Sequence, residues 1–489
     1  MKIFIPENLD IDILIHNNPP EFKKRKFKRD ELLYIIHLVS AISQTNKDLL
    51  FEDFVPINAQ MLQNLFKNYK EYLGYLIIDL KIVESDNQYI VGVRSKGYRF
   101  TKKYRTTVNP IAIIDKRFKK KLQRHKLKKE QSVKHLDHLT KWFNPKLKID
   151  KEAVHDFLKE EYETKQGDYD LWDYDRIKKM HKKPLHQYNH AKMSVDKLSW
   201  QDFNLMLDNN VYRFHSNLTN MRSVVRNAIT YDGEKLISID IKNSQPYLST
   251  VLLSRAFWIE ENKHASSLSL TFFDPKKRPI KGFNHIINDL SSNVSNTNTT
   301  VTYIMLGDCP QPITSKGLQH YIDLVVNGGF YEYLGKQFTK ELGIGFRDRK
   351  EVKAAVFQVL FTSNQFIGQE AAKPKKIFKK LFKQVYDVFA QIKKRDKSIL
   401  PRLLQSIESY LMIDVIAKRI SIEYPEAPIF TIHDSITTTE EYVDVVEQIM
   451  LEELAKAIGH SPELKREDWD IKNLTKHLDT LKQKSKKVA

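Results

Sequence analysis

A strand, a turn and a helix are predicted in immediate succession by residues 236–247, which read LISIDIKNSQPY. Leu236, Ile239 and Ile241 indicate a short strand, and Asp240 points to the face opposite its isoleucine neighbours. Asn, Ser and Pro residues then end the strand, and the apolar run that starts at Tyr247 predicts a buried helix. A carboxylate where a strand turns into a helix is well placed to bind a metal ion, although such an aspartate more often caps the helix.

A second carboxylate is predicted at the tip of a hairpin by residues 428–439, which read PIFTIHDSITTT. β-Branched residues flank the turn at His433, Asp434 and Ser435, and this pattern is typical of two short strands. If the hairpin tip lies beside the end of the first strand, Asp240 and Asp434 face each other. Two carboxylates that hold two Mg²⁺ ions are the minimal apparatus for an in-line displacement at phosphorus.

A helix face that is cationic at its start and aromatic at its end is predicted by residues 349–362, RKEVKAAVFQVLFT. Arg349, Lys353, Phe357 and Phe361 recur every four residues and therefore share one face of a helix. Such a face can bind a triphosphate with its cations and stack a base on its rings. The alternative is a half-buried amphipathic helix whose cations are only solvated, which is the commoner case for a single match of this kind.

These three segments, in this order, resemble motifs A, B and C of the right-hand polymerases in the group of family A DNA polymerases and single-subunit, phage-type RNA polymerases. Asp240 and Asp434 match the two metal-binding aspartates, and Arg349 and Lys353 match the Arg-x-x-x-Lys of the fingers helix. His433-Asp434-Ser435, followed by Thr438, is similar to the phage-type motif C, whereas DNA polymerases usually carry His-Asp-Glu there. The resemblance covers residues 205–450.

The resemblance implies an α+β fold with a palm-type antiparallel sheet, helical fingers and a thumb. It implies a template-directed nucleotidyltransferase that uses two Mg²⁺ ions, for which Mn²⁺ is a substitute. The expected partners are a nucleic-acid template with its primer and nucleoside triphosphates. Lys353 would assist the leaving group, Arg349 would clamp the γ-phosphate, and Phe357 and Phe361 would pack on a base.

Three further positions match residues that contact the primer or template in the resembled enzymes. Arg213 and Asn220 lie in a segment similar to the Gly-Arg motif upstream of motif A, with Tyr212 where the glycine is expected. Gln405 resembles the glutamine before motif C that contacts the template strand. The neighbouring Glu408 faces the same way one turn later, and a structural role is the simplest expectation for it.

The sugar of the substrate is expected to pass Gln245, with Ser244 beside it. Family A DNA polymerases carry at the position of Gln245 a bulky glutamate that excludes a 2′-hydroxyl. Phe357 also resembles the DNA enzymes, whereas Ser435 resembles the RNA enzymes. DNA synthesis is therefore favoured over RNA synthesis, with a phage-type RNA polymerase as the alternative.

The composition indicates a polyanionic partner. The chain of 489 residues carries 80 Lys and Arg against 61 Asp and Glu, a net charge of +19, which favours nucleic acid. Cys309 is the only cysteine, so no internal disulfide and no cysteine-rich zinc site can form. We find no signal peptide and no apolar run long enough to span a bilayer, so we expect a cytoplasmic protein without a membrane partner.

The N-terminal part predicts a small, winged-helix-like domain. Helices are expected at residues 30–42, 59–66 and 69–76, followed by strands at 81–84 and 89–93. Arg94, Lys96 and Arg99 crowd the end of that hairpin and would contact phosphates, unless the module serves protein contacts. The expected divisions are an N-terminal segment, 1–29; the winged-helix-like domain, 30–105; a basic connector with a thumb-like helical region, 106–200; and the palm and fingers, 201–489.

Two other classes of function remain open at this stage. A metal nuclease or transposase could use Asp240 and Asp434, but it would have no use for the triphosphate face of Arg349 and Lys353. A non-catalytic replication initiator could be built on the winged-helix-like domain and bind DNA without synthesis. The oligomeric state, the primer requirement and the nature of the template are not predicted by the sequence.

Overall fold

Strand β12 (Glu234–Ile241), which contains the segment described above, lies inside the largest sheet of the computed structural model. The structure describes residues 1–23, 25–45, 53–90, 92–175, 180–259, 268–269, 299–307, 315–343, 345–346, 348–369 and 372–488. Cys309 falls outside these ranges. Helices and strands are mixed along the chain, and every strand pair within the described ranges is antiparallel, so the fold is α+β.

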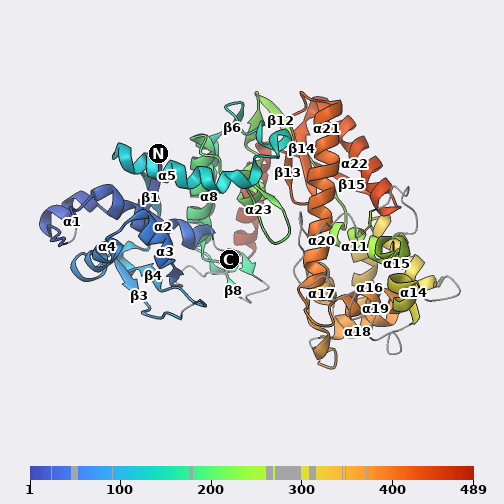
Figure 1. The fold of residues 1–489 in the computed structure, drawn as a ribbon. Helices are drawn as coiled ribbons and strands as arrows, with labels where there is room; N and C mark the ends of the chain where they lie inside the picture. The colour runs from blue at the N-terminus through green and yellow to red at the C-terminus, as the bar shows by residue number, and fades with distance from the viewer. Residues whose placement is uncertain are drawn as a thin grey trace.

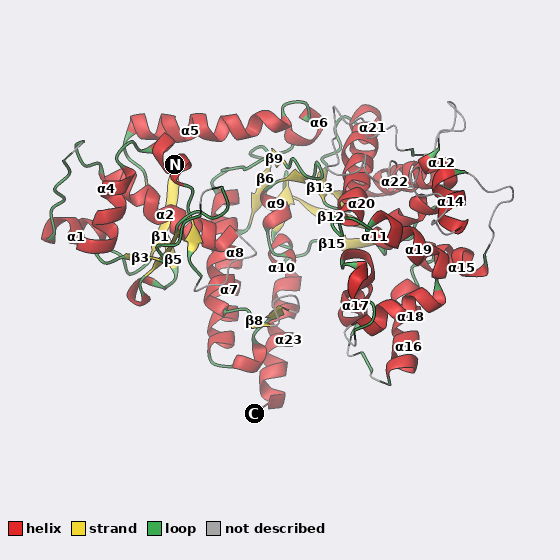
Figure 2. Cartoon of the chain, turned by 60° about the horizontal axis from the view of Figure 1, so that its bottom comes forward, coloured by secondary structure: helices red, strands yellow, loops and turns green. Residues whose placement is uncertain are grey.

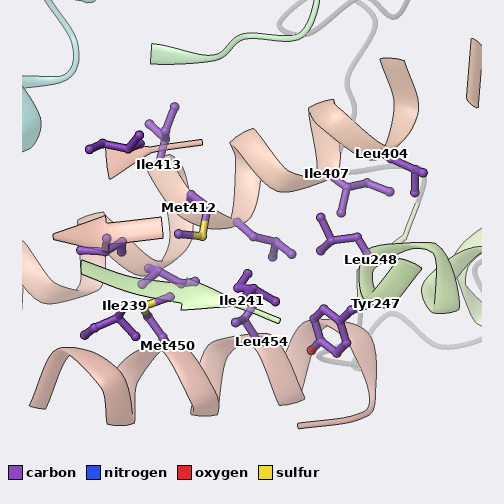
Figure 3. Close-up of a cluster of buried hydrophobic side chains, with 14 of the residues drawn as sticks. Ile239, Ile241, Tyr247, Leu248, Leu404, Ile407, Met412, Ile413, Met450 and Leu454 are labelled. Carbon is purple, nitrogen blue, oxygen red and sulfur yellow. The ribbon is translucent and has the colours of Figure 1, made fainter. Parts of the chain in front are cut away.

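The central sheet has the order β13-β14-β12-β11-β6, and β15 also pairs with β12. Its other strands are β6 (Leu147–Ile149), β11 (Ile229–Tyr231), β13 (Phe430–Ile432), β14 (Ser435–Thr439) and β15 (Leu464–Asp468). The isoleucines of β12 point into the core, where Ile239 and Ile241 pack among Met412, Met450 and Leu454 (Figure 3). The core lies on this face because β12 alternates apolar and polar residues at its end, which leaves Asp240 on the other face.

Helices cover the apolar face of the sheet and continue the core. They are α20 (Ile399–Ser409), a π-helical turn (Tyr410–Ile416), α21 (Ala417–Glu423) and α22 (Val443–Ile458). After β12 the chain enters α11 (Ser244–Ser249), where Tyr247 and Leu248 are buried near Leu404 and Ile407 (Figure 3). The predicted strand, turn and helix of residues 236–247 are thereby confirmed.

A group of helices follows on one side of the sheet, at the right of Figure 2. These are α12 (Arg255–Trp258), α14 (Thr299–Leu306), α15 (Lys316–Val326), α16 (Phe330–Leu342), α17 (Arg349–Phe361), α18 (Lys373–Leu381) and α19 (Lys383–Ile392). Helix α17 contacts α16, α18 and α20, and it begins at Asp348, whose side chain caps it. The predicted helix at residues 349–362 is confirmed.

The opposite side of the sheet carries three long helices, α7 (Lys151–Gln166), α8 (Pro184–Ser199) and α23 (Lys472–Val488). Helix α7 contacts both of the others. Helix α5 (Lys116–Glu130) extends from the N-terminal module toward α6 (Asp137–Thr140), as Figure 2 shows. The short elements of this region are β7 (Tyr174–Asp175), β8 (Met180–His181), β9 (Met206–Leu207), β10 (Phe214–His215), α9 (Asn217–Asn220) and α10 (Ser223–Arg226).

The N-terminal module has its own hydrophobic core, which runs from Ile3 to Leu122, and it lies at the left of Figure 1. A sheet of order β2-β4-β3 packs with the helices, and β1 pairs with β5. The elements are β1 (Lys2–Pro6), α1 (Ile11–Asn17), α2 (Arg29–Thr45), β2 (Val55–Pro56), α3 (Ala59–Leu65), α4 (Tyr69–Gly74) with a π-helical turn (Tyr75–Asp79), β3 (Val83–Ser85), β4 (Gly97–Phe100) and β5 (Val108–Ala112). The three predicted helices are confirmed within a few residues at their ends.

The predicted strand at residues 89–93 is wrong, because β3 pairs with β4 at residues 97–100 instead. Tyr89, Ile90 and Val93 are exposed, so the apolar residues that suggested a strand have no core to pack against. Asp86 closes the loop, since its carboxylate accepts from the N–H groups of Gln88 and Gly97. No helix in the described ranges is long and apolar enough to cross a membrane.

Candidate functional site

Asp240 and Asp434 lie at neighbouring ends of two paired strands, as predicted. Asp240 of β12 is directly opposite Ser435 of β14, and the N–H of Ile241 donates to the carbonyl oxygen of Asp434 at 3.4 Å. His433 and Asp434 form the two-residue loop between β13 and β14. His433 has φ of 56°, a left-handed conformation that tight hairpin turns require. Two carboxylates therefore meet at one edge of the sheet.

The local electrostatics show that this pair carries uncompensated negative charge. Burial, then the charges of Asp434 and Glu467, raises the pKa of Asp240 from 3.8 to about 6, and a hydrogen bond from Ser435 and the charge of Arg226 only partly oppose this. Glu467 belongs to β15, where it faces Ser238. Across the described ranges no group of three or more His, Cys, Asp or Glu residues is arranged to hold a metal ion.

Helix α17 presents the predicted stripe on one face. The Lys353 Nζ lies 5.4 Å from the ring centroid of Phe357, and the rings of Phe357 and Phe361 are 5.0 Å apart. Lys353 is exposed and the two rings are partly buried. The opposite face of α17 packs into the core through Val352, Ala355, Val356, Val359 and Leu360. The stripe therefore lies between this buried face and the exposed face of Lys350, Ala354 and Gln358, and its two rings pack against the core.

Arg349, at the start of α17, reaches the turn that follows Asp240. Its Nη2 donates to Oδ1 of Asn243 at 3.2 Å, and its Nε pairs with Oε1 of Glu332 at 2.8 Å. The guanidinium also lies 5.2 Å from the ring centroid of Tyr331. Burial raises the pKa of the Tyr331 phenol, Arg349 opposes this, and the charge of Asp434 adds to it, so Tyr331 belongs to the same electrostatic environment. No pattern in the sequence indicates a role for Tyr331.

A pocket of about 590 Å³ lies between α16 and the start of α17. Arg349, Lys336 and Lys340 contribute three cations to its lining, together with Tyr331 and Glu332. The lining reaches the α17 stripe only at Arg349 and includes neither Lys353 nor a residue of the turn after Asp240. The carboxylates of Glu332 and Asp348 also line this pocket, and Glu332 is paired with Arg349.

The turn after Asp240 contains buried polar atoms that lack partners. Asn243 has φ of 54° and begins α11, and Ser244 follows it in a buried position. In the described part of the chain, no hydrogen bond satisfies Nδ2 of Asn243, Oγ of Ser244 or Oε1 of Gln245. Buried polar atoms are ordinarily paired, and atoms left free at a site are available to a ligand.

Glu408 on α20 brings two of the predicted residues together. Its Oε1 accepts from Nε and Nη2 of Arg213 at 2.9 and 2.6 Å, and its Oε2 accepts from Nε2 of Gln245 at 2.7 Å. Glu408 is only 2 % exposed. Burial raises the pKa of Glu408 to about 7; Arg213 opposes this, and the charge of Asp434 adds to it. The sequence predicts only a structural role for Glu408, because its partners are distant in the chain.

Tyr212 occupies the position where the polymerase resemblance expects glycine. Its φ of 57° is the left-handed conformation that glycine adopts without cost. The hydroxyl of Ser409 donates to the carbonyl oxygen of Tyr212, which ties this turn to α20 next to Glu408. The backbone therefore has the glycine-like conformation even though the side chain differs.

Gln405 and Asn220 are more loosely placed. Gln405 is partly buried on α20, one turn before Glu408. Asn220 is exposed at the end of α9, a helix that contacts β10 and β13, and its side-chain amide lies 3.5 Å from the carbonyl oxygen of Ser216. Within the described ranges, neither side chain has a contact that assigns it a function.

The cations of the N-terminal loop are largely paired within their own module. Arg94 contacts Asp86 at 3.0 Å, and Arg99 contacts Glu84 at 2.8 Å while its guanidinium lies 4.0 Å from the ring centroid of Phe54. Lys96, between them, is partly buried. The Arg94 and Arg99 side chains are partly exposed, whereas that of Asp86 is only 7 % exposed.

Comparison with known proteins finds only distant similarity, and only among solved structures. No family model and no curated protein matches the chain. Among solved structures, the chain is similar to the POL domain of Pol1 from M. smegmatis, a complex with DNA primer-template and dNTP. That match has 12% sequence identity and a TM-score of 0.31, and it covers 72% of this chain and 73% of that chain. A similarity at this level carries no functional conclusion, which has to come from the residues of the site.

Proposed function

We propose that the chain is a template-directed nucleotidyltransferase that extends a primer, with DNA synthesis favoured. The observation that carries the proposal is the meeting of three elements: Asp240 ends β12, Asp434 lies at the adjacent hairpin tip, and Arg349 of α17 binds the turn between β12 and α11. A pair of carboxylates facing a cationic helix suits a triphosphate that reacts at phosphorus.

In this proposal each described region corresponds to one structural part of a polymerase. The central sheet is the palm, the helices from α12 to α19 are the fingers, and α7, α8 and α23 form the thumb. The N-terminal module would be winged-helix-like, which its element order α2-β2-α3-α4-β3-β4 and its sheet order β2-β4-β3 support. Arg94, Lys96 and Arg99 would contact the phosphates of nucleic acid, exchanging the carboxylates of Asp86 and Glu84 for them.

Asp240 and Asp434 would hold the metal, as two Mg²⁺ ions or Mn²⁺ in their place. Carboxylate oxygens are the ligands that Mg²⁺ prefers, and the raised pKa of Asp240 marks a negative pair that a dication would relieve. When bound, such ions lower the pKa of the attacking 3′-hydroxyl and neutralise charge on the reacting phosphate.

The remaining chemistry belongs to side chains of α17. The 3′-hydroxyl would lose its proton to water as its oxygen forms a bond to the α-phosphorus, the bond to pyrophosphate would break, and Lys353 would give the leaving group a proton. Arg349 would exchange Glu332 for the γ-phosphate in a bidentate contact, since guanidinium matches phosphate in geometry. Phe357 and Phe361 would stack on a base.

The preference for deoxyribose is supported by Gln245, which together with Ser244 begins α11, just after the turn that follows Asp240. The resemblance of Ser435 to RNA polymerases has less weight, because its hydroxyl donates to the carbonyl oxygen of Ile432 at 3.0 Å and also contacts Asp240. A serine whose hydroxyl stabilises the hairpin turn does not indicate which sugar the substrate carries. RNA synthesis remains the alternative outcome of the experiment.

The test is nucleotide incorporation by the purified full chain with Mg²⁺, using dNTPs or NTPs, on templates with and without a primer. We expect primer-dependent extension with dNTPs. Efficient extension with NTPs alone would assign RNA synthesis to the same site. Nucleic-acid binding or cleavage without incorporation of either substrate would contradict the proposal and favour an initiator or a nuclease.

A further inference from the structure

One buried carboxylate, Glu408, holds two site residues that come from distant parts of the chain. Arg213 donates twice to one of its oxygens and Gln245 donates once to the other, at separations of 195 and 163 residues. In the described part of the chain, the bond to Glu408 is the hydrogen bond that orients the Gln245 side chain, because none satisfies its Oε1.

We infer that Glu408 is a positioning residue that fixes Gln245 as the sugar gate and joins it to the primer-contacting Arg213. This inference rests on the proposed function. A carboxamide is planar, so anchoring its Nε2 at 2.7 Å also sets the direction of its Oε1. A side chain excludes a 2′-hydroxyl by steric clash only if it cannot change its rotamer. The hydrogen bond to Glu408 restrains the Gln245 side chain in this way.

The chemistry at Glu408 also explains why the gate is a glutamine. The polymerase resemblance expects glutamate at position 245. Here the partner is itself a carboxylate, so a glutamate at position 245 would bring two carboxylates together in a buried place, where their negative charges repel each other. Glutamine provides the N–H that the contact needs. The identities of residues 245 and 408 are therefore linked.

Arg213 completes the arrangement by balancing the charge of Glu408. The Arg213 side chain is 20 % exposed, whereas that of Glu408 is 2 % exposed, so the arginine can contact a primer on its exposed side while it remains bound to Glu408.

A swap of the two side chains tests the inference. We would compare the wild type with Gln245→Glu, Glu408→Gln and the double variant, measuring kcat/KM for matched dCTP and CTP on one primed template. Gln448→Glu is the control, because Gln448 makes the same amide–carboxylate contact to Glu452, 2.8 Å, on an exposed helix face. Unfolding in denaturant at pH 8 would be measured for all five proteins.

We expect each single variant to lose about tenfold in sugar discrimination, the usual effect of a lost hydrogen bond to a charged group. The double variant should recover most of that loss and most of the lost stability, and the control should change neither. Two results would overturn the inference without contradicting the proposed function. One is single variants whose ratio of kcat/KM for dCTP to that for CTP equals that of wild type, and the other is losses in sugar discrimination that simply add in the double variant. A wild type that incorporates neither nucleotide would overturn the proposed function as well.

Discussion

Asp240 and Asp434 meet because Asp240 pairs with Ser435 across β12 and β14, which places the hairpin tip directly beside the strand end. The charge of Asp434 then contributes to the rise in the Asp240 pKa to about 6. Two adjacent negative charges therefore destabilise the metal-free protein, whereas a dication bound between them would stabilise it.

The first prediction concerns pH and stability without metal. The folded pKa of Asp240, about 6, lies above its value of 3.8 in an unfolded chain, so the folded state holds the proton more tightly. The contribution of Asp240 to the free energy of unfolding should therefore decrease as pH rises from 4 through 6. Asp434→Asn should flatten this decrease and raise the free energy of unfolding at pH 7.5 by about 1–2 kcal/mol. Urea unfolding across this pH range in EDTA measures it.

Asp444→Asn is the matched control for that measurement, because Asp444 is 83 % exposed and pairs only with Arg466. It should leave the pH profile of wild type in place. An Asp434→Asn protein with the same pH dependence as wild type would show that the two carboxylates do not interact.

The second prediction concerns metal binding. Mg²⁺ or Mn²⁺ should raise the thermal midpoint of the wild type at pH 8, since a ligand that binds only the folded state stabilises it. The rise should shrink below pH 6, where Asp240 takes up a proton and competes with the ion. Asp240→Asn should remove the rise. A Mg²⁺ effect of full size in that variant would place the ion elsewhere.

The third prediction separates Arg349 from its neighbour on the helix. Arg349→Gln should reduce kcat/KM for the nucleotide by about 10–100-fold, the range for losing charged hydrogen bonds to phosphate. Lys350→Gln, an exposed change one residue away and off the stripe, should have little effect. Arg349→Lys should rescue poorly, because lysine lacks the bidentate geometry. Equal effects at both positions would mean that only the overall charge matters.

The fourth prediction concerns the N-terminal loop. Replacing Arg94, Lys96 and Arg99 together by glutamine should lower the slope of log affinity against log salt for duplex DNA by at most about 2.7, if each cation releases one counterion. The ion pairs to Asp86 and Glu84 should make the change smaller. Lys235→Gln, which removes an exposed cation paired with Asp470, is the control. An unchanged slope would favour a protein-contact role for the module.

The sequence could predict the site residues that lie on regular elements. Alternation in residues 236–241 and 430–439 predicted the paired strands, and the four-residue repeat from Arg349 to Phe361 predicted the helix face. Strand β15 escaped prediction because its sequence LKRED is charged and pairs through backbone hydrogen bonds that leave no apolar pattern.

The contacts between elements could not be predicted in the same way. Glu408 follows the helical pattern of α20, and nothing near it in the chain shows that Arg213 and Gln245 converge on its carboxylate. Tyr331 and Glu467 likewise enter the site through the packing of α16 and β15. The false strand at 89–93 shows the converse error, since apolar residues formed a pattern that no core supports.

The most direct test of the central claim is single-turnover incorporation of one correct dNTP on a primed template, measured for wild type, Asp240→Asn, Asp434→Asn and the control Asp444→Asn. We predict that each of the first two variants loses at least about a thousandfold in rate, as expected when a group that acts in the transition state is removed. The control should match wild type. Incorporation at or near the wild-type rate by either Asp240→Asn or Asp434→Asn would contradict the account.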